Sequence, residues 1–96
     1  MIPGPIRFLL WPDKGGVHMQ TVFVQIRCKP GTTYDVAFKI VLKEIHAELF
    51  STSGEYDLLV KLIIPKEEDI GRYINERLGD VEGIERTLTT LTFKAF

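Results

Sequence analysis

The stretch Ser51-Thr52-Ser53-Gly54-Glu55-Tyr56-Asp57-Leu58-Leu59-Val60 predicts a β-hairpin, and the rest of the fold is arranged around it. Hydroxyl residues end the first strand, and an apolar run continues the second. Gly54 suits the turn between them, because glycine adopts positive φ without steric cost. The hairpin therefore fixes two neighbouring antiparallel strands.

Asp57 is the unusual residue of this hairpin, because its carboxylate precedes the apolar run Leu58-Leu59-Val60 at the mouth of a half-buried strand. A charge in that place costs free energy unless another group partners it. Two interpretations are open from the turn chemistry. Asp57 caps its own turn through the backbone amides, or it holds a ligand.

Two further strands flank the hairpin in sequence. Residues 21–28 alternate between apolar and polar side chains, as a half-buried strand does. The hairpin strands cover residues 45–52 and 56–64, and a threonine-rich strand covers residues 84–96. One face of that closing strand carries Thr87, Thr89, Leu91 and Phe93.

Two helices are expected between these strands. The first follows Pro30-Gly31, takes Thr32 or Thr33 as its cap, and repeats apolar residues at helical spacing. The second begins at the acidic run 66–69 after Pro65 and ends near Gly79.

The order strand, helix, strand, strand, helix, strand predicts an α+β fold of the ferredoxin-like βαββαβ type. Its antiparallel sheet carries both helices on one face. The other face is then left with apolar side chains and no helix to cover it. These side chains are Phe23, Phe50, Leu59, Ile63 and Phe93. An apolar face of that extent predicts an oligomer that packs sheet against sheet.

Residues 1–18 differ from the domain expected over residues 19–96. Prolines and glycines interrupt this first segment, and it shows no periodicity. Three explanations remain open: an upstream start codon, a cloning remnant, or a native arm. The apolar run 8–11 is unfavourable in water, which is compatible with an arm packed on an oligomer, but the sequence does not choose between the three explanations.

The composition is that of one ordinary globular domain. The 96 residues are 45% hydrophobic and 26% charged, with a formal net charge of −1. That balance gives no basic footprint for nucleic acid. The single cysteine, Cys28, excludes an internal disulfide and favours the cytoplasm. We expect no metal site, because no Cys/His cluster has ligand spacing, and no membrane span, because no apolar run reaches ~20 residues.

Several of these segments together resemble a known family. The hairpin Thr52-Ser53-Gly54-Glu55-Tyr56-Asp57 is similar to the signature of the effector domain of Lrp/AsnC regulators, the feast/famine proteins. This module is also called the RAM domain. The resemblance covers residues 19–96. It includes the opening strand before Pro30-Gly31 and the closing Gly83-Ile84-Glu85-Arg86-Thr87-Leu88-Thr89.

The resemblance implies a non-catalytic module that binds a small molecule, typically an amino acid, and requires no cofactor. It implies a homodimer formed through the sheets, in a dimeric α/β barrel-like assembly, and a ring of dimers, most commonly an octamer. Ligands would bind between dimers. The implied ligand-binding residues are Ser53, Gly54, Glu55, Tyr56, Asp57, Thr87 and Thr89.

A full-length regulator of this family also carries a helix-turn-helix module of ~50–60 residues, built from at least two packed helices. Residues 1–18 cannot form it. The sequence therefore predicts a stand-alone effector domain, with no direct DNA binding of its own and with full-length Lrp/AsnC regulators as candidate partners.

Two other functions stay open. A purely structural partner of full-length regulators would form rings and bind nothing, although such a scaffold does not need the Gly54 and Asp57 turn. A small enzyme, such as a cofactor-free monooxygenase, is compatible with the fold. Only His46 and Tyr56 are acid/base candidates near the turn, and no recognisable catalytic arrangement is present.

Overall fold

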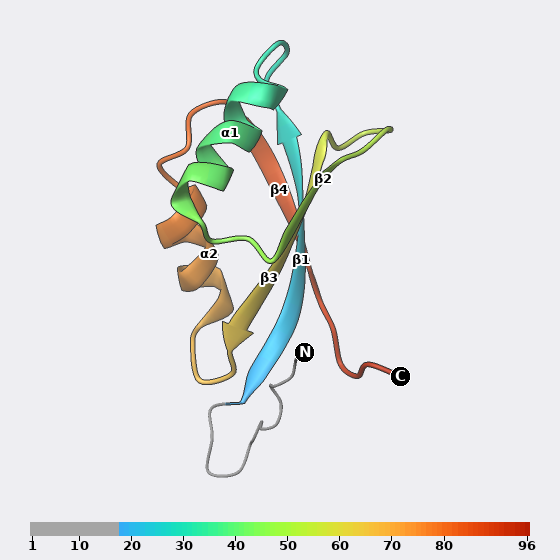
Figure 1. Cartoon of the computed structure of the whole chain (residues 1–96), viewed down its shortest axis with the longest axis vertical. Helices are drawn as coiled ribbons and strands as arrows, with labels where there is room; N and C mark the ends of the chain where they lie inside the picture. Colours follow the sequence, from blue (N-terminus) through green and yellow to red (C-terminus); the bar gives the residue numbers. More distant parts are fainter. Residues whose placement is uncertain (1–17) are drawn as a thin grey trace, which may run out of the picture.

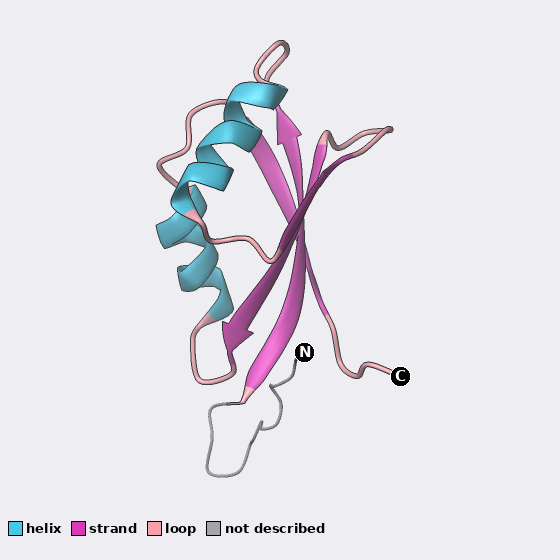
Figure 2. Ribbon diagram, viewed as in Figure 1, coloured by secondary structure: helices cyan, strands magenta, loops and turns pink. Residues whose placement is uncertain are grey.

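The computed structural model describes residues 18–96, which form a four-stranded sheet with two helices on one face (Figures 1 and 2). The elements are β1 (Met19–Cys28), α1 (Thr33–Lys43), β2 (Glu48–Ser51), β3 (Leu58–Pro65), α2 (Ile70–Leu78) and β4 (Ile84–Leu91). The predicted ferredoxin-like βαββαβ order is confirmed. The first segment, residues 1–18, lies outside the described part except for His18, so its three explanations stay open.

The sheet has the strand order β2-β3-β1-β4, and every neighbouring pair is antiparallel. β1 lies in the centre and pairs with β3 and β4, while β2 and β4 form the two edges. Residues paired across the strands share one face of the sheet. Val22, Val24 and Ile26 of β1 are fully buried, so their partners Leu91, Thr89 and Thr87 on β4 also belong to the helix face.

The core lies between the sheet and the two helices. Val36 and Ile40 of α1 have no exposed surface, and Ile74 and Leu78 of α2 are nearly as buried. The sheet contributes alternate residues of β1 and β3, as their period-two burial shows. This layer is what holds the ends of β1 and β4 in fixed positions.

The open face carries apolar side chains as predicted. Phe50 is 49% exposed and Ile63 is 41% exposed. Leu88 of β4 lies on the same face and is 48% exposed. The sequence analysis missed Leu88. Phe93 was wrongly included, because β4 ends at Leu91 and Phe93 lies beyond the sheet, 99% exposed.

The hairpin strands are shorter than predicted. β2 begins at Glu48 instead of residue 45, and β3 begins at Leu58 instead of Tyr56. Residues 44–47 form the connection from the end of α1 to the start of β2, between the helix layer and the sheet. The connection between the two strands is therefore a longer turn, residues 52–57, which the hydrogen bond from the Thr52 amide to the Asp57 carbonyl closes.

The helix caps also differ from expectation. Thr32 precedes α1 without capping it, because its hydroxyl donates to the carbonyl of Lys29 at 2.7 Å instead. Asp69 is the cap of α2, accepting a hydrogen bond from the Arg72 amide at 3.1 Å. Gly79 does end α2, but with a right-handed φ of −65°. Its amide still donates to the Asn75 carbonyl at 2.8 Å, and a Cβ at Gly79 would clash with that oxygen, so the close approach and not positive φ explains the glycine.

Gly83 fixes the approach of β4 to α1. Its φ is +103°, and a Cβ there would lie 2.7 Å from Cγ2 of the buried Val36. Its carbonyl accepts from the amide of Lys29 at 2.7 Å, which joins this loop to the end of β1.

Gly83→Ala should therefore lower the stability more than Gly31→Ala. Gly31 also has positive φ, +82°, but a Cβ there meets nothing within 4 Å. Backbone strain of about 1–3 kcal/mol acts at both positions, and only Gly83 adds a clash with the core. A drop of ~4–8 °C in Tm is expected for each kcal/mol lost. Equal Tm values for the two variants by calorimetry would contradict this packing.

Candidate functional site

The turn between β2 and β3 is closed by its own backbone and side chains. The amide of Thr52 donates to the carbonyl of Asp57 at 2.9 Å, and the Thr52 hydroxyl donates to the carbonyl of Tyr56 at 2.9 Å. Gly54 has the predicted positive φ, +96°. Ser53, Gly54 and Glu55 are exposed at the tip of this loop, which lies on the side of the sheet away from the helices (Figure 1).

Asp57 joins this turn to the end of the central strand. Its Oδ2 accepts a hydrogen bond from the Cys28 amide at 2.7 Å, and its own amide donates to the carbonyl of Ile26 at 2.8 Å. The interpretation that Asp57 caps its own turn is therefore wrong. The carboxylate is partnered across the strands, which satisfies the last free amide of β1.

Cys28 is affected by the same contact. Burial, and after it the negative charge of Asp57, raise the pKa of the Cys28 thiol, while a hydrogen bond from Thr33 acts in the opposite direction. Cys28 is 6% exposed. It is therefore a poor nucleophile at neutral pH.

Two arginines complete the surroundings of the turn. Arg27 donates from Nη1 to the carbonyl of Glu55 at 2.7 Å, and its Nε lies 3.5 Å from the Glu85 carboxylate. Arg86 pairs with the carboxylate of Glu55, and its guanidinium lies 5.6 Å from the centre of the Tyr56 ring. Tyr56, and after it Glu55, raise the pKa of Arg86.

These arginines were not identified from the sequence. Arg27 and Arg86 face each other across β1 and β4, on the open face of the sheet. Like charges in directly opposed positions repel, so such a pair is stable only where anionic groups lie nearby. A register shift next to this pair brings Glu85 beside Arg27. The signal that could have identified them is an arginine near the end of β1 and another near the start of β4, the two strands that pair.

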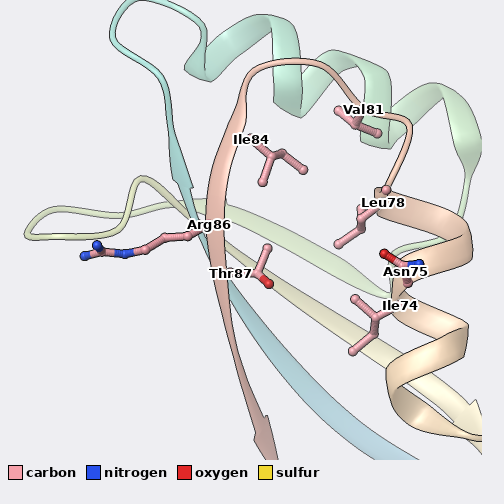
Figure 3. A pocket seen from close by; sticks show the side chains of 8 residues that line it. Ile74, Asn75, Leu78, Val81, Ile84, Arg86 and Thr87 are labelled. Atoms are coloured by element: carbon pink, nitrogen blue, oxygen red, sulfur yellow. The ribbon is translucent and has the colours of Figure 1, made fainter.

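The two threonines predicted for the site lie elsewhere. Thr87 and Thr89 are on the helix face, whereas Arg86 points from β4 toward the hairpin (Figure 3). Thr87 lines a cavity of about 220 Å³ between α2 and β4. Ile74, Leu78, Val81 and Ile84 form its apolar wall, and Asn75 adds an amide. One protomer thus brings Ser53–Asp57 next to Arg27 and Arg86, but not next to Thr87 and Thr89.

His46 does not belong to this group. It precedes β2, whereas Tyr56 follows it, so the two lie at opposite ends of that strand. The expectation that His46 lies near the turn is therefore wrong. Among residues 18–96 there is no group of three His, Cys, Asp or Glu side chains that could hold a metal ion. Within the same residues, no helix is both long and apolar enough to cross a membrane.

Comparisons with known proteins identify the family to which this domain belongs. The family model described as the Lrp/AsnC ligand binding domain matches residues 21–96. The chain belongs to the Lrp/AsnC family. It is 32% identical over 72 residues to the HTH-type transcriptional regulator FL11 of Pyrococcus furiosus, a match that covers 75% of this chain and 47% of that one. The chain spans about half the length of this curated relative.

Solved structures give the same fold. The protein TTHA0845 from Thermus thermophilus matches with a TM-score of 0.72 and 30% identity, over 80% of this chain and 96% of that chain. The transcriptional regulator NMB0573 of Neisseria meningitidis, solved as an L-Met complex, has a TM-score of 0.68 at 14% identity. The match covers 78% of this chain and 50% of that chain. The Lrp/AsnC domain fold predicted from the hairpin signature is confirmed.

The contact between Asp57 and Cys28 predicts a change in thiol reactivity. Asp57→Asn keeps an oxygen acceptor for the Cys28 amide but removes the negative charge, which should lower the pKa of Cys28 toward its ordinary value. Alkylation by iodoacetamide at pH 8–9 should become several-fold faster. Burial remains, so the thiol should stay less reactive than a free cysteine.

Mass spectrometry of the alkylated protein measures this rate. Asp69→Asn, which removes a carboxylate from the start of α2, is the matched control and should leave the rate unchanged. An unchanged rate in Asp57→Asn would show that the Asp57 charge does not act on Cys28.

Proposed function

We propose that this chain is a non-catalytic ligand-binding and assembly module that acts in transcriptional regulation of metabolism, with an amino acid or a similar small metabolite as its ligand. The observation that carries the proposal is the exposed Gly54 turn beside two opposed arginines, in a chain of the Lrp/AsnC ligand-binding family. The named relatives are transcriptional regulators, which supports a regulatory role and not a catalytic one.

The turn offers groups for both ends of a zwitterion. Gly54 allows the backbone amides to approach a carboxylate closely, and Arg86 is half exposed and paired to another exposed side chain, Glu55. Asp57 and Glu55 supply carboxylates for an ammonium group. Several hydrogen bonds of ~0.5–1.5 kcal/mol each suit a micromolar to millimolar Kd.

The cavity between α2 and β4 supplies a second part of the proposal. Thr87 provides a hydroxyl at its wall and Thr89 lies on the same face of β4. The turn lies on the open side of the sheet, and Thr87 and Thr89 lie on the helix face, although Arg86 borders both the turn and the cavity. We therefore place the threonine contacts on a neighbouring subunit, so that the ligand lies between subunits. The apolar wall suits an apolar side chain, as in the methionine bound by NMB0573.

The open sheet face is the proposed dimer interface. Phe50, Ile63 and Leu88 are each between 41% and 49% exposed there. Lys61 and Glu48, 3.7 Å apart, form an ion pair on the same face, and Lys61 lies on β3 between Leu59 and Ile63. Packing two such sheets face to face would remove the apolar side chains from water. A homodimer, an octameric ring and co-assembly with full-length regulators all remain proposals.

A purely structural module is the second candidate, because the open face supports assembly whether or not a ligand binds. Direct DNA binding by this chain is not part of either proposal. A net charge of −1 provides little of the phosphate attraction on which non-specific DNA affinity depends. A cytoplasmic location likewise stays a prediction.

Ligand binding should appear as thermal stabilisation. At ~100 times Kd, a ligand that binds only the folded state adds about 2.7 kcal/mol, which raises the Tm of a domain of this size by roughly 10 °C or more. At least one of the twenty amino acids should give such a shift. Asp57→Asn should remove it, because the ammonium group loses its counter-charge, while Glu68→Gln, far along the chain in the β3–α2 loop, should keep it.

Two outcomes would contradict this proposal, and the first of them would favour the purely structural module. The first is no shift and no calorimetric heat with any amino acid. The second is a full shift in Asp57→Asn, which would show that the turn is not the site.

The dimer should depend on the open face. Phe50→Glu introduces a charge on the edge strand β2, within the proposed sheet contact, where its desolvation is unfavourable. Light scattering at micromolar concentration should show a smaller assembly than the parent, with an unchanged circular dichroism spectrum. Glu48→Gln, at the border of the same strand, should keep the parental mass. A parental protein that is monomeric would contradict the interface.

A further inference from the structure

Arg86 holds the side chain of Glu55 at the tip of the turn. Within residues 18–96, Arg86 is the one ion-pair and hydrogen-bond partner of the Glu55 carboxylate. The side chain of Glu55 is 64% exposed, and that of Arg86 is 50% exposed. An ion pair so open to water adds little free energy, because water and salt compete with it. Each partner can therefore exchange the other for a ligand group of the same charge.

The backbone of Glu55 is fixed, so its side chain can move alone. Arg27 donates from Nη1 to the Glu55 carbonyl at 2.7 Å, which holds the tip of the turn next to β1. Rotation about the side-chain bonds of Glu55 releases Arg86 without moving this backbone. Asp57 is different, because its Oδ2 accepts from the half-buried amide of Cys28 at 2.7 Å. Moving Asp57 would leave that amide unsatisfied, so Glu55 is the carboxylate of the turn that can change partners.

Arg86 is the arginine that is available to a ligand carboxylate. Arg27 is already held by the carbonyl of Glu55 and the carboxylate of Glu85. Arg86 lines the cavity between α2 and β4, and its guanidinium points away from the cavity toward the turn (Figure 3). It thus borders both parts of the proposed ligand site. Without a ligand, the carboxylate that Arg86 binds is that of Glu55.

We propose that Glu55 is a specificity-determining residue that takes the place of the ligand carboxylate at Arg86, so that a ligand binds only by displacing it. This inference rests on the proposed ligand site. An arriving carboxylate takes over Arg86, and the displaced Glu55 carboxylate turns to the ammonium group of the same ligand. The exchange admits free amino acids and disfavours carboxylic acids that lack the ammonium group.

The charges around the turn explain this selection. Two arginines lie there among three carboxylates, which belong to Glu55, Asp57 and Glu85. A zwitterion leaves this balance unchanged and offers the displaced Glu55 a new cation. A simple carboxylate adds a negative charge and leaves Glu55 without a partner. An unpaired charge that only the wrong ligand creates is a general means of specificity.

The size of the effect follows from the exposure of the two side chains. An exposed ion pair changes a binding constant by up to about fivefold. Removing the Glu55 charge abolishes the competition at Arg86, which strengthens the binding of any carboxylate. It also abolishes the contact to the ammonium group, which weakens the binding of an amino acid. The two effects offset each other for an amino acid, whereas only the first acts on a deaminated analogue.

Glu55→Gln is the direct test, read by calorimetric titration of the full chain. The two ligands are an amino acid that stabilises the parent and its deaminated analogue, which keeps the same carboxylate and side chain. The parent should prefer the amino acid. In Glu55→Gln the analogue should bind about two- to fivefold more tightly than it binds the parent, while the Kd of the amino acid should change by less than about twofold.

Glu48→Gln is the matched control. Glu48 is also a half-exposed carboxylate on the open side of the sheet, but its partner is Lys61 and not an arginine of the turn. This variant should keep the parental preference between the two ligands. Circular dichroism checks that each variant is folded, and a purely structural effect of either change would alter the affinity for both ligands alike.

The outcomes for this inference and for the proposed site are distinct. A parent that binds no amino acid overturns the proposed function, and this inference with it. A parent that binds an amino acid, with the same preference over the analogue in Glu55→Gln, overturns the role of Glu55 and leaves the ligand site standing. An equal fall of the preference in Glu48→Gln would show a general effect of surface charge and would also overturn the proposal.

Discussion

The contact on which the candidate site depends is the hydrogen bond from the Cys28 amide to Asp57, at 2.7 Å. Without it, the end of the central strand would have an unsatisfied amide, and the 52–57 turn would be held only at its base. Because Asp57 also donates its own amide to Ile26, the turn is fixed to β1 through two bonds. This fixed base allows the tip, from Ser53 to Glu55, to stay exposed in a defined position. Such a combination suits recognition better than a flexible loop does.

The charges around the turn follow from strand register. β1 and β4 bring Arg27 and Arg86 into directly opposed positions, and Glu55 and Glu85 supply the anions that make this tolerable. Both ion pairs are well exposed and contribute little to the stability of the fold. They are therefore free to exchange partners, and a ligand carboxylate could replace Glu55 at Arg86 at little cost. This is the physical link between the assembly of the sheet and the proposed binding of a zwitterion.

The sequence predicted those parts of the fold that depend on local pattern. Alternation in residues 21–28 predicted β1, and the Gly54 turn predicted the hairpin of β2 and β3. The hairpin signature predicted the family. The errors come from contacts between distant residues. The role of Asp57 depends on Cys28, 29 residues away, and the helix-face position of Thr87 depends on pairing with Ile26. Leu88 was missed for the same reason, because its pairing with Gln25 sets its face, and Phe93 was included because no proline or glycine marks the end of β4 at Leu91.

The central claim is that the 53–57 turn and the α2–β4 cavity form one ligand site that two subunits share. Amide chemical-shift mapping by NMR, during titration with each amino acid that stabilises the protein, tests it most directly. The account predicts shifts of Gly54, Glu55 and Asp57 together with Thr87 at the same ligand concentration, and loss of both groups of shifts in Asp57→Asn. Shifts confined to other residues, or at the cavity alone and unchanged in that variant, would contradict it.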